Sequence, residues 1–71
     1  MEENILSLIR YHAMIGDFTE STSLYDIMDS LDVIELSFDL EKEFSIKISS
    51  RELYSVETLG DLISLTKSKI L

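Results

Sequence analysis

Few residues of this 71-residue sequence could carry chemistry, and the best placed is a serine. Ser30 follows Asp29 and precedes a run with helical apolar spacing, so Asp29 is expected to cap a helix that Ser30 begins. The serine hydroxyl would then point to solvent beside unpaired backbone N–H groups, at the positive end of the helix dipole. A phosphodiester on Ser30 would therefore lie where a helix favours negative charge.

The same residues have a simpler interpretation. An Asp-Ser pair before an apolar helix is common, and Asp29-Ser30-Leu31 alone is explained by helix initiation. The neighbouring carboxylates would also repel an added phosphate, although they could hold a basic modifying enzyme in place. On the tripeptide alone we favour a simple helix start over a modified serine.

Other kinds of site are poorly supported. The chain has no cysteine and a single histidine, His12, which excludes thiolate chemistry and a multi-histidine metal site. His12 is expected to be a partly buried helix residue, because it extends an apolar helical face, and it forms no evident nucleophile–base pair with Ser30. Asp26, Asp29 and Asp32 are spaced by three rather than two, without a glycine at the turning position of a calcium loop. We therefore predict no catalytic residues and no dedicated metal site.

The net charge of −8 is concentrated in one part of the chain. Residues 17–43 contain nine acids and one base, whereas the remaining residues contain five of each. Such a stretch disfavours nucleic acid, because the phosphates would be repelled, and it suits partners with basic patches. A need for solubility would explain the acidity but not its concentration.

Helices are predicted to position these residues. The first is expected over residues 3–13, and a long loop over 14–28 follows it. The second begins near Asp29 and ends at about Phe44. The loop is expected to be held on the core by four residues: Phe18, Leu24, Tyr25 and Ile27.

Two further helices complete the prediction. Ser49-Ser50-Arg51-Glu52 fits the capping-box pattern and should open a short helix ending near Tyr54, and Thr58 opens the last helix. We therefore predict one all-α domain over residues 1–71, a small four-helix bundle with a short third helix and a long loop between helices one and two.

The second predicted helix has two apolar faces. One should build the core: Val33, Leu36, Leu40 and Phe44. The other lies more than about 100° away and joins Leu31, Ile34 and Phe38 to a band of carboxylates. An apolar patch edged by charge indicates a protein-binding surface, unless the loop or the short helix covers it.

Size and hydropathy point to a carrying or binding role. A 71-residue domain buries a modest core and leaves little room for an enclosed active site. No apolar run approaches the roughly 18 residues of a membrane span. The acidic start Met1-Glu2-Glu3-Asn4 differs from the basic start of a secretory signal. We therefore expect a soluble, cytoplasmic protein.

A longer motif reverses the preference for a simple helix start. The run from Asp29 to Leu36, D-S-L-D-V-I-E-L, followed by L-E-K-E-F over residues 40–44, resembles the prosthetic-group segment of acyl carrier proteins. The later residues also match the family pattern: Ile48, Val56-Glu57-Thr58-Leu59 and Leu62-Ile63. The resemblance covers roughly residues 24–66. Ile27 departs from it, since the family usually has glycine three residues before the serine; a one-residue deletion would instead place Ile27 where the family has leucine. Ser49 also departs from it, where many members have proline.

The resemblance implies a role for Ser30. The serine would receive 4′-phosphopantetheine from coenzyme A through a phosphopantetheinyl transferase, and the terminal thiol of the arm would carry an acyl chain as a thioester. Helix two would contact partner enzymes through seven residues: Asp29, Leu31, Asp32, Ile34, Glu35, Phe38 and Glu41. The acyl chain could enter an apolar pocket for which Leu40, Ile48 and Leu53 are candidates.

Three interpretations remain at this stage. The leading one is a monomeric acyl carrier that serves acyl-transferring and acyl-modifying enzymes of fatty-acid, polyketide or related lipid synthesis. The alternatives are an aminoacyl or peptidyl carrier, and an acidic adaptor that lacks the arm and binds basic partners through helix two. Replacing Ser30 with alanine would spare an adaptor and abolish the function of a carrier.

The dense carboxylates of residues 17–43 generate a first prediction. Magnesium or calcium is expected to bind loosely among them and to relieve their mutual repulsion, which raises the melting temperature. Thermal unfolding followed by circular dichroism, with sodium chloride at matched ionic strength as the control, measures this effect. A melting temperature that the divalent salts leave unmoved contradicts the prediction.

Overall fold

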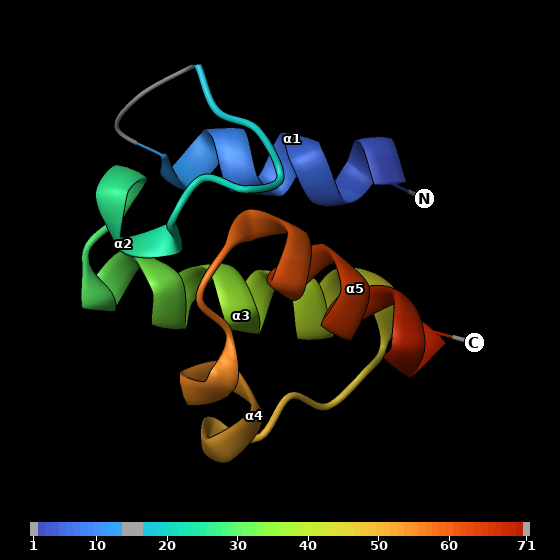
Figure 1. The fold of residues 1–71 in the computed structure, drawn as a ribbon. Coiled ribbons are helices and arrows are strands. Elements are labelled where there is room, and N and C mark those ends of the chain that lie inside the picture. The colour runs from blue at the N-terminus through green and yellow to red at the C-terminus, as the bar shows by residue number, and fades with distance from the viewer. Residues whose placement is uncertain (1, 14–16, 71) are drawn as a thin grey trace.

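A computed structural model describes residues 2–13 and 17–70, and this part of the chain forms five helices (Figure 1). They are α1 (Glu2–His12), α2 (Leu24–Ile27), α3 (Ser30–Phe44), α4 (Ser50–Ser55) and α5 (Leu59–Ile70). The predicted all-α fold is confirmed, and the four expected helices lie within one or two residues of their predicted bounds. None of the described helices has the length and apolar character needed to cross a membrane.

The helix that the sequence did not predict is α2. It is a single turn inside the segment expected to be a loop, whose residues 14–16 lie outside the described part of the chain. Leu24 and Ile27 are buried at its two ends, and Phe18 is half-buried. Tyr25 does not hold this segment on the core as expected, since 48% of its surface is exposed.

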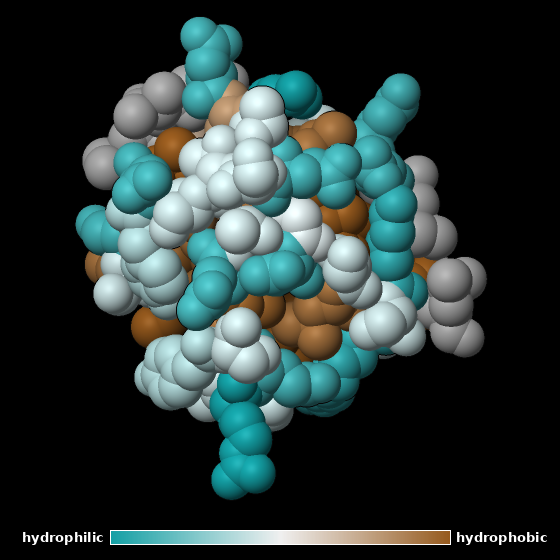
Figure 2. All heavy atoms as spheres, in the orientation of Figure 1, coloured by the Kyte–Doolittle hydropathy of each residue, from teal (hydrophilic) through white to brown (hydrophobic). Residues whose placement is uncertain are grey.

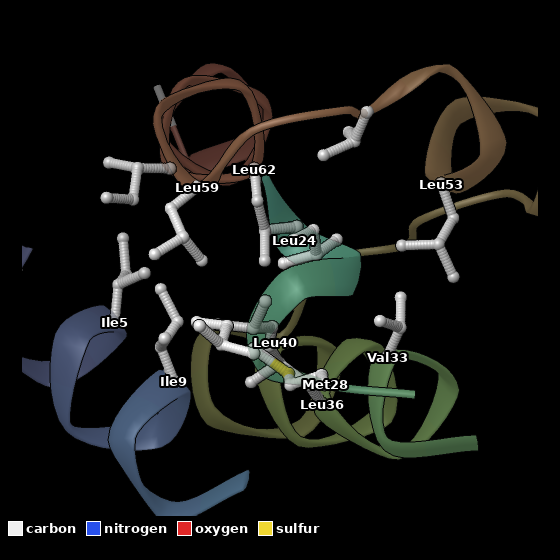
Figure 3. Close-up of a cluster of buried hydrophobic side chains, with 13 residues drawn as sticks. Ile5, Ile9, Leu24, Met28, Val33, Leu36, Leu40, Leu53, Leu59 and Leu62 are labelled. Carbon is white, nitrogen blue, oxygen red and sulfur yellow. The ribbon is translucent and has the colours of Figure 1, made fainter. Parts of the chain in front are cut away.

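The core lies where α1, α3 and α5 meet. Ile5 and Ile9 point from α1 toward α3 and α5, and Leu59 and Leu62 point back from α5 (Figure 3). The remaining members of the buried cluster come from α2, α3, α4 and α5 and from the turns beside α2 and α4: Leu24, Ile27, Met28, Val33, Leu36, Leu40, Leu53, Val56 and Ile63. On the face drawn in Figure 2, apolar surface shows only in patches between polar and pale side chains.

Backbone hydrogen bonds tie the segment before α2 to the start of α5. The N–H of Leu24 donates to the carbonyl of Glu57 at 2.8 Å, and the N–H of Gly60 donates to the carbonyl of Glu20 at 2.8 Å. A Cβ atom on Gly60 would lie 3.0 Å from that Glu20 oxygen, so glycine permits the close approach. These contacts fix α2, and with it the entry into α3.

Helix α4 is short and depends on polar contacts at its start. Ser49 and Glu52 form the predicted capping box: the Glu52 N–H donates to Ser49 Oγ at 3.1 Å, and the Ser49 N–H donates to Glu52 Oε1 at 3.0 Å. The other carboxylate oxygen of Glu52 pairs with Lys69 Nζ of α5 at 2.6 Å. The hydrogen bonds from Lys69 and from the Ser49 backbone lower the pKa of Glu52 from 4.5 to about 2.

The pKa of Glu52 generates a prediction about acid stability. A carboxyl group with a lowered folded-state pKa stabilises the protein above its unfolded pKa, and this contribution is lost as the pH falls from about 4.5 to about 2. Glu52→Gln should therefore lower the urea midpoint at pH 7 and have much less effect near pH 2.5. Urea unfolding followed by circular dichroism at both pH values measures this. The control is Glu43→Gln, which removes an exposed carboxylate of α3; an equal loss for Glu52→Gln at both pH values contradicts the prediction.

Candidate functional site

Ser30 is the first residue of α3, and its side chain is exposed. The cap is made by Asp29, whose Oδ1 accepts the Asp32 N–H at 2.8 Å and whose carbonyl accepts the Val33 N–H at 3.1 Å. Because Asp29 caps the helix, the Ser30 hydroxyl is not needed for this purpose. It stands in the first turn, where the partial positive charge of a 15-residue helix favours an anion.

Two buried residues, the last of α2 and the one after it, set the direction of the chain into Ser30. Ile27 and Met28 are 2% and 1% exposed, and the Met28 N–H donates to the Leu24 carbonyl at 3.2 Å. Ile27 is the last residue of α2. Among the described non-glycine residues, the positive φ angle is found at Ser45 and not at Ile27. The position where the family usually has glycine therefore needs no left-handed backbone here, and an apolar side chain fills the core instead.

The two apolar faces predicted for α3 are present. On the core face, Val33, Leu36 and Leu40 are at most 2% exposed, and Phe44 is half-buried. On the other face the three apolar residues stand in solvent, with exposures of 63% for Leu31, 38% for Ile34 and 62% for Phe38. Two tyrosines that the sequence did not connect with this patch are exposed on the neighbouring helices, Tyr25 on α2 and Tyr54 on α4.

The acidic residues of α3 have different surroundings. Asp32 is half-buried, whereas Glu35 is exposed. Glu41 Oε2 accepts the Ile48 N–H at 2.8 Å, so Glu41 also holds the segment between α3 and α4 in place. Helical spacing does not predict this contact, because it joins residues seven positions apart through a non-helical segment.

His12 contacts the same row of acids. Its side chain is 9% exposed, as expected for a partly buried helix residue, and its Nε2 lies 2.6 Å from Asp39 Oδ2. Ligand atoms of His12, Asp32 and Glu35 also lie within 4.8 Å of one another. Sequence spacing could not reveal the contact of His12 with Asp39, since the two residues are 27 positions apart. The histidine joins the end of α1 to the acidic side of α3.

A small cavity lies between α3 and α4. Its volume is about 130 Å³, and we call it the α3–α4 cavity; its lining residues are Ile34, Ser37, Phe38, Ile48, Ser50, Leu53 and Tyr54. Ile48 and Leu53 were predicted to bound such a pocket, whereas Leu40 is fully buried in the core and is not in the lining. The Ser37 hydroxyl donates to the Ile34 carbonyl at 2.7 Å, which satisfies the polar group in the wall.

Ser30 lies on the same side of α3 as this cavity. At 100° per residue, Ser30, Ile34 and Ser37 fall within about 60° of one another around the helix axis, and Ile34 is about 6 Å further along it. A group attached to Ser30 would therefore start one turn from the mouth of the cavity. Figure 3 shows the side chains of Leu53 of α4 and Val33 of α3 pointing toward each other.

Comparison with known proteins agrees with this geometry. Residues 14–65 match the family model described as "Phosphopantetheine attachment site". The acyl carrier protein of Thermotoga maritima is 37% identical over 54 residues, which cover 73% of this chain and 67% of that protein. The acyl carrier protein homolog of Mycoplasmopsis pulmonis is 40% identical over 52 residues, covering 72% of this chain and 71% of that protein.

The fold has a close counterpart among solved structures. The crystal structure of an acyl carrier protein from Thermotoga maritima matches 97% of this chain and 88% of its own, with a TM-score of 0.80 and 22% sequence identity. At that identity the likeness establishes the fold, while the family model and the two relatives establish the family. The chain therefore belongs to the acyl carrier protein family, whose members are carriers rather than enzymes and bear covalently attached 4′-phosphopantetheine.

Proposed function

We propose that this chain holds acyl intermediates as thioesters on a 4′-phosphopantetheine arm attached to Ser30. The observation that carries the proposal is the exposure of Ser30 in the first turn of α3, where Asp29 and not the serine provides the cap. Ser30 offers the attachment oxygen, and the helix N-terminus favours the negative charge of the phosphodiester. The arm supplies the thiol that carries the acyl chain.

The proposed partners are a phosphopantetheinyl transferase and acyl-handling enzymes of fatty-acid, polyketide or related lipid synthesis. The surface that they contact is Asp29, Leu31, Asp32, Ile34, Glu35, Phe38 and Glu41. Its carboxylates would attract basic patches and accelerate encounter, while its exposed apolar side chains would supply the contact area. The same acidity disfavours self-association of two copies, so the carrier is proposed to act as a monomer.

Attachment at Ser30 is tested with the purified protein. Incubation with coenzyme A, magnesium and a broad-specificity transferase should add one phosphopantetheinyl group, and Ser30→Ala should abolish the gain. Intact-protein mass spectrometry measures it. Ser50→Ala is the matched control, because Ser50 is also an exposed serine that begins a helix. If the folded protein gains nothing while a known carrier is modified alongside it, the proposal fails.

The partner surface is tested by the rate of that modification. Phe38→Ser removes an aromatic side chain that is 62% exposed and is expected to lower the transferase kcat/KM about fivefold or more, as loss of an interface anchor worth about 1 kcal/mol would do. Tyr11→Ser is the control, since Tyr11 is 82% exposed on α1 and outside the proposed surface. Equal rates for both variants and the parent would exclude Phe38 from the surface.

A further inference from the structure

Three side chains from two helices meet on the acidic side of α3. A ring nitrogen of His12, a carboxylate oxygen of Asp32 and a carboxylate oxygen of Glu35 lie within 4.8 Å of one another. His12 is the last residue of α1, and the two acids lie in the first two turns of α3. The spacing of the acids alone predicted no dedicated metal site, but the fold adds an imidazole to two of them.

The imidazole of His12 is held in a fixed orientation. Its side chain is 9% exposed, its Nε2 lies 2.6 Å from Asp39 Oδ2, and the Tyr11 ring packs against it edge-on with the centroids 5.1 Å apart. A carboxylate can only accept a hydrogen bond, so Nε2 donates to Asp39 and Nδ1 of the neutral ring keeps its lone pair. Within residues 2–13 and 17–70, no hydrogen bond involves this Nδ1 atom. Histidines that bind metal commonly have this arrangement, with a carboxylate on one ring nitrogen and the metal on the other.

The two carboxylates beside the imidazole lack a basic partner. The ion pairs found in the described part of the chain involve other acids, so no lysine or arginine there neutralises Asp32 or Glu35. Asp32 is also half-buried, which weakens the screening of its charge by solvent. A cation between the two carboxylates would offset their mutual repulsion.

The spacing of the three atoms suits a small metal ion. Nitrogen and oxygen ligands of a tetrahedral zinc ion lie about 2.1 Å from the metal and therefore about 3.4 Å from one another. The atoms of His12, Asp32 and Glu35 are at most 4.8 Å apart, so each pair has to approach by no more than about 1.4 Å. Glu35 is exposed and can make this adjustment by a change of rotamer, while the buried imidazole stays in place.

We propose that His12, Asp32 and Glu35 bind a zinc ion, and that Asp39 orients the imidazole. Water would complete the tetrahedron as the fourth ligand. The imidazole nitrogen gives the site its selectivity, because magnesium and calcium prefer ligand sets made of oxygen alone. The ion joins the end of α1 to the start of α3. This site does not depend on the proposed attachment of the arm at Ser30.

Isothermal titration calorimetry with zinc chloride tests the site. The titration uses the full chain without its arm, since the thiol of the arm would itself bind zinc, and it contains an excess of magnesium chloride. One zinc ion should bind per chain. His12→Gln should weaken the affinity about tenfold or more, and Asp39→Asn about tenfold, the effect of losing an outer partner. The matched control is Asp26→Asn, which removes an exposed acid of α2 and should match the parent.

Proton NMR of the parent protein gives a second readout that needs no variant. The chain has a single histidine, so the imidazole signals belong to His12 without ambiguity. An equimolar amount of zinc should shift these signals, and the same amount of magnesium should leave them unmoved. Imidazole signals that zinc does not shift overturn the proposal. A folded His12→Gln variant that binds zinc as tightly as the parent also overturns it, because zinc would then bind the acidic surface in general.

Discussion

The hydrogen bond from the Asp32 N–H to Asp29 Oδ1, 2.8 Å long, is the contact on which the site depends. The first turn of any helix has N–H groups that need acceptors, and a serine or aspartate at the N-cap commonly supplies one. Here Asp29, the residue before Ser30, supplies it, at a stabilisation of about 1 kcal/mol for a cap of this kind. Because Asp29 provides the cap, Ser30 has an exposed hydroxyl at the N-terminal end of α3, which is the positive end of the helix dipole.

The second constraint is that a chain of 71 residues can cover only one side of its central helix. Helix α3 packs against α1, and its Val33–Leu36–Leu40 face is buried, whereas the opposite face with Leu31 and Phe38 remains in solvent. Three large apolar side chains on one exposed helix would be a liability in a protein with no partner. Beside a row of carboxylates they form a surface suited to basic proteins, which fits the family of carriers to which the chain belongs.

Local patterns in the sequence predicted most of this arrangement. The caps at Asp29 and Ser49 involve residues three positions apart, and the two faces of α3 follow from helical periodicity. What local patterns could not predict are contacts between distant residues, such as the contact of His12 with Asp39. The single turn of α2 was missed because four residues are too few to establish a period.

Helix α4 connects stability with the carrying role. It buries a single residue, Leu53, and its other attachments are the Ser49–Glu52 capping box and the ion pair of Glu52 with Lys69. An element with so little buried apolar area opens at a smaller cost in free energy than the α1–α3 pair, whose side chains fill the core. Helix α4 also forms one wall of the α3–α4 cavity. An acyl chain would therefore enter and leave beside the helix that opens more easily. A bound chain adds apolar contact to that wall, so the cargo itself should hold α4 in place.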